Sequence, residues 1–117
     1  MRLRDIYNNT NKQPVISFEV FPPRTPEGLH NLIGELQKLL VYKPGLISVT
    51  YGAGGTSQDR SLQALERIAK EIPVPTMAHV TCIGSSTRSV AHFLQLIEAW
   101  GVDNVLALRG DYPKNKP

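Results

Sequence analysis

The sequence predicts an α/β fold in which helices connect the strands of a parallel sheet. Short runs of β-branched and aromatic residues alternate three times with apolar residues at helical spacing, and a last strand follows. Proline and glycine mark the borders between these segments. Connections long enough to hold a helix join parallel strands, and such crossovers are right-handed. Two architectures have this pattern, the doubly wound open sheet and the (β/α)8 barrel.

The first strand is predicted over residues 15–21, where the sequence reads VISFEVF. A Pro-Pro pair ends it, because proline cannot donate to a central ladder. The next helix is expected to start with Thr25 as its N-cap and Pro26 in its first position, and to stop at the Lys-Pro-Gly of residues 43–45. Its apolar face comprises Leu29, Leu32, Ile33, Leu36, Leu39 and Leu40.

The second strand is predicted over residues 46–51 and is followed by a glycine-rich loop at 52–55. Thr56 or Ser57 is expected to cap the next helix, with Asp59 near its positive end. The apolar face of this helix comprises Leu62, Leu65, Ile68, Ala69 and Ile72.

The third strand is predicted over residues 76–83, and a turn at 84–87 leads into the third helix. Gly101 suits the C-terminal cap of that helix, and a fourth strand follows at 104–109. The side chains expected to face the core from this helix are Val90, Phe93, Leu94, Ile97 and Trp100.

Each predicted strand has one apolar face, because alternate residues point to opposite sides of a sheet. The apolar faces hold Ile16, Phe18, Val20, Ile47, Val49, Ala78, Val80, Cys82, Leu106 and Leu108. The opposite faces hold Ser17, Glu19, Ser48, Thr50, Met77, His79, Thr81, Ala107, Arg109 and, by extension, Asp111. An open sheet covered by helices on both sides would be apolar on both faces. The pattern therefore favours the barrel, with these polar groups inside and near the strand ends where barrel enzymes carry their active sites.

Four ionisable groups on the inner face are predicted to form one functional site. They are Glu19, His79, Arg109 and Asp111. Buried charges are costly unless they are paired or used, and a cluster of them is typical of an active site. The alternative is an inert network of satisfied polar groups, which is the better interpretation for an isolated residue such as Ser17.

Composition excludes several other classes of function. The 117 residues suffice for one small domain, and 41% apolar with 20% charged residues is ordinary for a globular protein. No apolar run is long enough for a membrane span or a signal peptide. The net charge of +3 is mild and scattered, so neither nucleic acid nor a membrane is an expected partner. The single cysteine, Cys82, is expected in the core and indicates a reducing cytoplasm, and no His/Cys spacing suggests a metal site.

Four sequence blocks follow one another in register along the chain. They read SFEVFPPR at 17–24, SVTYGAGG at 48–55, AHVTC at 78–82 and ALRGD at 107–111. Together they resemble methylenetetrahydrofolate reductase of the bacterial type, over nearly the whole chain. The resemblance implies a (β/α)8 barrel that binds FAD at the C-terminal ends of its strands. It also implies reduction of 5,10-methylenetetrahydrofolate to 5-methyltetrahydrofolate by NADH or NADPH, in the one-carbon metabolism that leads to methionine.

The resemblance also assigns roles to individual residues. Glu19 matches the catalytic glutamate, whose expected role is to protonate the ten-position nitrogen of the folate so that the ring opens to an iminium cation. Such an acid must hold a proton near neutral pH, and the flanking Phe18 and Phe21 are compatible with an apolar setting. Asp111 is expected near the folate and the flavin ring, where its carboxylate would stabilise that cation.

The remaining matches are contacts with the two nucleotide cofactors. Thr50 is expected near the nicotinamide, and Arg109 at the FAD pyrophosphate or paired with a carboxylate. By resemblance, the FAD contacts are Tyr51, Ala53, His79, Arg109, Gly110 and Asp111.

A complete barrel has eight strands and about 250 residues, whereas this sequence accounts for four strands and three helices. We therefore expect residues 1–117 to form the N-terminal half of a barrel domain, with open strand edges, weak or no FAD binding and no turnover in isolation. A pterin-binding or methyl-transfer barrel without flavin and a non-catalytic scaffold module are the alternatives. The complete protein is a candidate for homo-oligomer formation.

Overall fold

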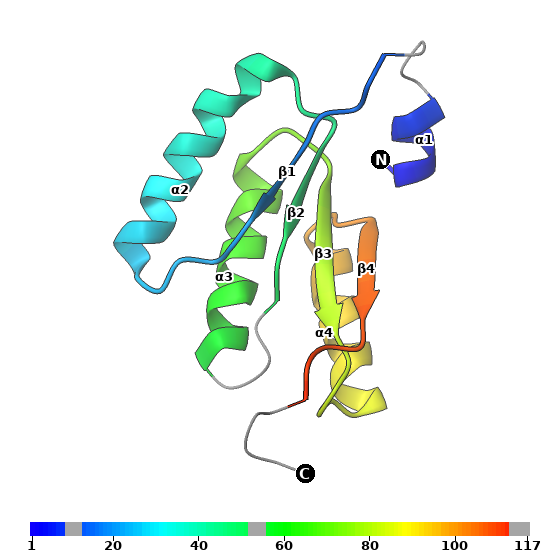
Figure 1. The fold of residues 1–117 in the computed structure, drawn as a ribbon. Helices are drawn as coiled ribbons and strands as arrows, with labels where there is room; N and C mark the ends of the chain where they lie inside the picture. Colours follow the sequence, from blue (N-terminus) through cyan, green and yellow to red (C-terminus); the bar gives the residue numbers. More distant parts are fainter. Residues whose placement is uncertain (9–12, 52–55, 113–117) are drawn as a thin grey trace.

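The computed structural model describes residues 1–8, 13–51 and 56–112 (Figure 1). Four parallel strands form one sheet in the order β1-β2-β3-β4, so each strand lies beside its neighbour in sequence. The strands are β1 (Ser17–Val20), β2 (Leu46–Val49), β3 (Thr76–Thr81) and β4 (Asn104–Leu108). The helices are α1 (Leu3–Asn8), α2 (Pro26–Leu39), the 3-10 turn η1 (Leu40–Tyr42), α3 (Thr56–Glu71) and α4 (Thr87–Ala99). The α/β class and the predicted alternation are confirmed, and this strand order is that of four successive barrel strands.

One face of the sheet is covered by helices α2, α3 and α4, and the core lies between the two layers (Figure 1). The sheet contributes Val20, Ile47, Val49, Ala78 and Val80 to this core. The helices contribute Leu29, Ile33, Leu36, Ala64, Leu65, Ile68, Phe93 and Ile97, and Ile72 follows α3 directly. The predicted apolar faces of α2 and α3 and of the first three strands are therefore confirmed in their central parts. The prediction is wrong for Ile16, which precedes β1 and is 46% exposed. Among the described residues, no helix lies over the opposite face of the sheet, which we call the open face.

The predicted helix borders on α2 and α4 are confirmed in detail. The Thr25 hydroxyl accepts a hydrogen bond from the Gly28 N–H at 3.0 Å, as an N-cap does. Gly101 has φ of +82° and donates its N–H to the Glu98 carbonyl at 3.0 Å, which ends α4. Lys43, rather than a glycine, takes the left-handed conformation after η1, with φ of 53°. The loop predicted at 52–55 lies outside the described residues, as do the side chains expected to cap α3.

Two further predictions about apolar side chains on the helix side are wrong. Leu94 was expected in the core, yet it is 39% exposed because α4 turns Phe93 and Ile97 toward the sheet instead. Cys82 was also expected in the core, and it is exposed. It follows the end of β3 and borders a surface hollow beside Val90 and Leu94, where α4 covers the sheet incompletely.

The fourth strand faces the opposite way from the prediction. Paired residues of neighbouring parallel strands point to the same side of a sheet. His79 pairs with Leu106 and Thr81 pairs with Leu108, so both leucines lie on the open face and Ala107 lies on the helix side. The strand reads NVLAL, and four of its residues in succession are apolar. Alternation of apolar and polar residues therefore could not show which of them face the helices. Pairing with β3 decides this instead.

Helix α1 was not predicted, because its six residues are too few to show a sustained apolar period, and only Ile6 is buried. It is held against the start of β4 by the buried side chain of Asn104. The Asn104 amide oxygen accepts from the Leu3 N–H at 2.7 Å, and its nitrogen donates to the Met1 carbonyl at 2.9 Å. Ile6 packs near Gly45, where an added Cβ would lie 3.3 Å from its methyl carbon. The start of the chain thus ties the N-terminal ends of β2 and β4 together.

The observed strands are shorter than predicted, because a strand ends where its pairing partner ends. In β1, for example, only Ser17–Val20 has partners, at Leu46–Val49 of β2. No helix in the described ranges is long and apolar enough to cross a membrane.

Candidate active site

Most of the predicted site residues lie near or just past the C-terminal ends of the four strands, where the structure groups them in separate places. Glu19 lies in β1 and His79 in β3, while Thr50 and Tyr51 follow β2 directly. Arg109, Gly110 and Asp111 follow β4. Ala53, the remaining predicted FAD contact, lies outside the described residues.

Glu19 and His79 meet on the open face across the intervening strand. The Glu19 Oε1 atom lies 3.5 Å from the His79 Nε2 atom. Glu19 pairs with Ser48 in β2, and Ser48 pairs with Met77, two residues before His79 in β3. The His79 side chain is 8% exposed, whereas that of Glu19 is 51% exposed. The sequence-based prediction that these two groups share the inner face is confirmed by this contact.

The apolar setting considered for Glu19 is not formed by its flanking phenylalanines. Phe21 is 69% exposed, and Phe18 pairs with Ile47, whose side chain belongs to the helix side. Strand alternation places Phe18 on the side opposite Glu19. Within the described part of the chain, the Glu19 carboxyl is therefore open to solvent and to any molecule that approaches the open face.

The segment after β4 reaches the site through a bend rather than by strand alternation. Gly110 has φ of +86°, and an added Cβ would lie 2.7 Å from Ile83 Cγ2, so both backbone and space require glycine. The Arg109 Nε donates to the Gly110 carbonyl at 2.9 Å, and its guanidinium carbon lies 4.7 Å from the Tyr112 ring centre. The alternation that was extended to Asp111 does not hold here, because the bend breaks it.

A hollow of about 490 Å³ lies at the ends of β3 and β4. Its lining comprises Tyr51, Thr81, Leu108, Arg109, Gly110 and Asp111. This volume falls in the range of pockets that hold small organic ligands. The guanidinium of Arg109 provides N–H donors for an anionic group such as a phosphate ester, whereas the Asp111 carboxylate at the same hollow suits a positively charged or N–H-bearing group. Four of the predicted cofactor contacts are thereby brought together.

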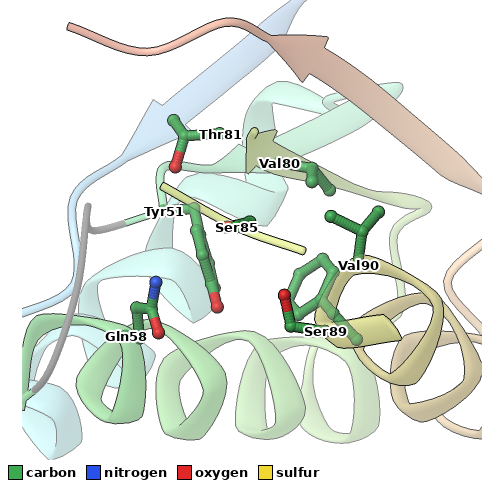
Figure 2. A pocket seen from close by; sticks show the side chains of 8 residues that line it. Tyr51, Gln58, Val80, Thr81, Ser85, Ser89 and Val90 are labelled. Atoms are coloured by element: carbon green, nitrogen blue, oxygen red, sulfur yellow. The ribbon is translucent and has the colours of Figure 1, made fainter. Parts of the chain in front are cut away.

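Tyr51 points its ring into the helix layer, as Figure 2 shows. The ring packs against Phe93 with 4.8 Å between centroids, and its hydroxyl lies toward a small cavity of about 40 Å³. Burial raises the pKa of Tyr51 above its usual value of 10.0, and the nearby negative charge of Asp59 raises it further. Tyr51 therefore stays neutral at physiological pH. The polar residues around this cavity, among them Gln58 and Ser89, were not singled out in the sequence analysis.

Thr50 borders a second hollow, of about 200 Å³, at the ends of β1 and β2. Its N–H donates to the Val20 carbonyl at 3.1 Å, which holds it beside the first strand. Arg24 and Arg60 line the same hollow. Sequence reasoning did not assign either arginine, although Arg24 ends the SFEVFPPR block. Two guanidinium groups at one opening favour a negatively charged ligand.

In the described ranges, no group of three or more His, Cys, Asp or Glu side chains could hold a metal ion.

Comparison with known proteins identifies relatives of this chain. Residues 2–117 match the family model described as methylenetetrahydrofolate reductase. "Methylenetetrahydrofolate reductase (NADH) 1" of Arabidopsis thaliana is 42% identical over 101 residues, which covers 86% of this chain and 17% of that protein. "5,10-methylenetetrahydrofolate reductase" of Buchnera aphidicola subsp. Schizaphis graminum is 33% identical over 105 residues, covering 90% of this chain and 36% of that protein. The corresponding Pectobacterium carotovorum protein is 34% identical over 99 residues, or 85% and 33%. The chain thus spans 17% to 36% of the length of these relatives.

Proposed function

This chain belongs to the methylenetetrahydrofolate reductase family, and from that premise we propose that the complete gene product reduces 5,10-methylenetetrahydrofolate to 5-methyltetrahydrofolate. The proposed reductant is NADH or NADPH, acting through FAD. The observation that carries the proposal is the Glu19 carboxyl on the open face, 3.5 Å from the buried His79 imidazole. It lies toward the end of the sheet where barrel enzymes bind their substrates. Family membership favours this reaction over the methyl-transfer alternative.

The residues around the end of β4 fit a flavin dinucleotide in two respects. Gly110 lacks the Cβ that would collide with Ile83, so the chain can bend there and bring Arg109 and Asp111 to one hollow. Arg109 lies beside it with guanidinium N–H groups suited to a pyrophosphate. When bound, FAD supplies the hydride chemistry between nicotinamide and folate.

The acid and charge roles belong to residues of this chain. Glu19 is open to the face from which a folate would approach, and it is the proposed proton donor to the ten-position nitrogen. Asp111 is exposed in the hollow at the end of β4, where its carboxylate would stabilise positive charge developing on the ring-opened folate. Thr50 borders the arginine-lined hollow at the end of β2, which supports its proposed place near the nicotinamide nucleotide.

We further propose that the protein acts in the cytoplasm as an enzyme of one-carbon and methionine metabolism. The single cysteine, Cys82, is free and exposed, which suits a reducing compartment. Its small folate substrate would be its partner, with neither nucleic acid nor membrane involved.

Replacing the carboxyl of Glu19 tests the proposal directly. In the complete gene product, Glu19→Gln should leave flavin reduction by NAD(P)H within about twofold of the unchanged protein. Folate-dependent turnover should fall by roughly 100-fold or more, because a positioned general acid contributes that much to rate. Stopped-flow absorbance of the flavin separates the two half-reactions.

Glu35→Gln is the matched control, because Glu35 is an exposed carboxyl on α2 that forms an ion pair with Lys38 at the helix surface. It should change neither half-reaction. Equal loss of both half-reactions in Glu19→Gln would contradict the role proposed for this residue.

A further inference from the structure

We propose that His79 is a positioning residue that holds the Glu19 carboxyl in place for proton transfer. The inference rests on the proposed function and deepens it. It adds a role to a residue that the sequence analysis assigned only to the flavin. Three features of the open face carry it: the unequal burial of the two side chains, the small residue between them and the distance that separates them.

The two partners differ in how firmly the fold holds them. His79 lies in β3, which pairs with strands on both sides, and its side chain is 8% exposed. Glu19 lies in β1, at the edge of the described sheet, and its side chain is 51% exposed. A free glutamate side chain samples many rotamers, and ordering it costs up to about 2 kcal/mol. A fixed imidazole beside the carboxyl reduces the number of rotamers that Glu19 samples before the substrate binds.

Ser48 makes the contact possible. It lies in β2 between the two partners, pairing with Glu19 on one side. Neighbouring strands are about 4.8 Å apart, and His79 lies two residues, or about 6.6 Å, past the β3 partner of Ser48. Glu19 and His79 must therefore span roughly 12 Å between their backbones, along a diagonal that passes Ser48. A serine side chain is short enough for the two longer side chains to meet above it. A large residue at position 48 would separate them.

The distance between the partners leaves room for a stronger contact in the working enzyme. At 3.5 Å, the Nε2–Oε1 separation exceeds an ordinary hydrogen bond, which is about 2.7–3.2 Å. Catalytic hydrogen bonds are often long in the unliganded protein and shorten when the substrate binds. When Glu19 passes its proton to the folate nitrogen, a carboxylate remains. The His79 Nε2–H can then donate to that carboxylate and stabilise it.

A double-mutant cycle in the complete gene product tests this role. His79→Ala should lower kcat of the folate half-reaction by about 10- to 100-fold, as small misplacements of catalytic groups do. Flavin reduction by NAD(P)H, measured with saturating FAD, should fall by less than the folate half-reaction does. Glu19→Gln combined with His79→Ala should lose no more than Glu19→Gln alone, because His79 acts only through that carboxyl. His79→Gln, which keeps an N–H donor, should recover most of the rate.

The inference would be overturned if the double variant lost kcat of the folate half-reaction by the product of the two single-variant losses. Equal loss of both half-reactions together with loss of bound flavin in His79→Ala would also overturn it, because His79 would then serve the flavin alone. Ser48→Leu gives a second approach that leaves both partners intact. It should reproduce the His79→Ala defect in the folate half-reaction, and an unchanged rate would contradict the geometry.

Nitrogen NMR of the histidine rings tests the contact independently of turnover. At one pH, Glu19→Gln should change the ring ¹⁵N shifts of His79 in the complete gene product. The shifts of His30 and His92, which are exposed on α2 and α4, should not change and serve as internal controls. Unchanged His79 shifts would sink the inference even if the reductase activity stands. Absence of folate reduction in the unchanged complete protein would instead refute the proposed function.

Discussion

The two faces of this sheet come from the same strands and do different work. On the helix-covered face, Ile47, Val49 and Ala78 are at most 2% exposed and form the core with three helices. On the open face, the same strands present Glu19, Ser48 and His79 to one another. Strand alternation thus places the core side chains on one face and the candidate catalytic side chains on the other. A shift of the strand register by one residue would move each side chain to the opposite face.

The largest expected effect on stability comes from the covered face. Ile68 in α3 is 0% exposed at the centre of the core, and Ile68→Ala should lower the free energy of unfolding by about 3 kcal/mol. Leu106→Ala is the matched change on the open face, where the side chain is 41% exposed, and it should cost less than about 1 kcal/mol. Urea denaturation followed by circular dichroism gives both values. Similar losses would break the proposed division between the faces.

A smaller loss is expected at the far end of the open face, where a polar group is used for stability. Asn104→Ala removes both hydrogen bonds that hold α1 and should cost about 2 kcal/mol. Asp103→Asn is the control, because the ion pair between Asp103 and the N-terminal ammonium is exposed and should contribute less than about 1 kcal/mol. Faster amide exchange in α1 of Asn104→Ala would locate the effect. Equal effects of the two variants would show that charge, not the buried amide, holds the helix.

A still smaller effect is expected from Tyr51 at alkaline pH. Its pKa in the folded chain is raised by burial, so the fold favours the neutral phenol. The stability that this preference contributes is complete below pH 10.0, the usual value, and is lost as pH rises through the raised folded value. Tyr51→Phe should therefore flatten the loss of stability above that pH. Thermal unfolding of both proteins across the alkaline range measures the difference, and parallel curves would contradict it.

The smallest effect on stability should come from the residue with the largest expected effect on catalysis. Glu19 is half exposed, so Glu19→Gln should change the free energy of unfolding by no more than about 0.5 kcal/mol. A loss near that of Ile68→Ala would mean that the open face supports the fold as much as the covered face does. Denaturation of the two variants under one set of conditions decides between these outcomes.

Much of the fold was predictable because helix and strand signals are local. The caps at Thr25 and Gly101 and the apolar stripe of α2 follow from residue types a few positions apart. The same holds for the shared face of Glu19 and His79, because β1 and β3 alternate clearly between apolar and polar residues.

The failures occurred where local signals are weak or misleading. The apolar run of β4 has no clear alternation, and α1 is too short to show a period. Cys82 follows the apolar phase of β3, yet it lies beyond the residues that α4 covers. Parity shows which side of a strand a residue faces, but it does not show whether another element lies over that side.

By itself, the sequence determined the order of strands and helices, the apolar faces that form the core and the polar face that carries Glu19 and His79. These follow from side-chain periods of two and 3.6 residues, which need no knowledge of distant partners. Only the tertiary structure decided which residues of β4 lie on the open face and which hydrogen bonds Asn104 makes to α1. It also decided the distance of 3.5 Å between Glu19 and His79. Each of these depends on the pairing of segments far apart in the chain. That pairing is settled when all the strands pack together.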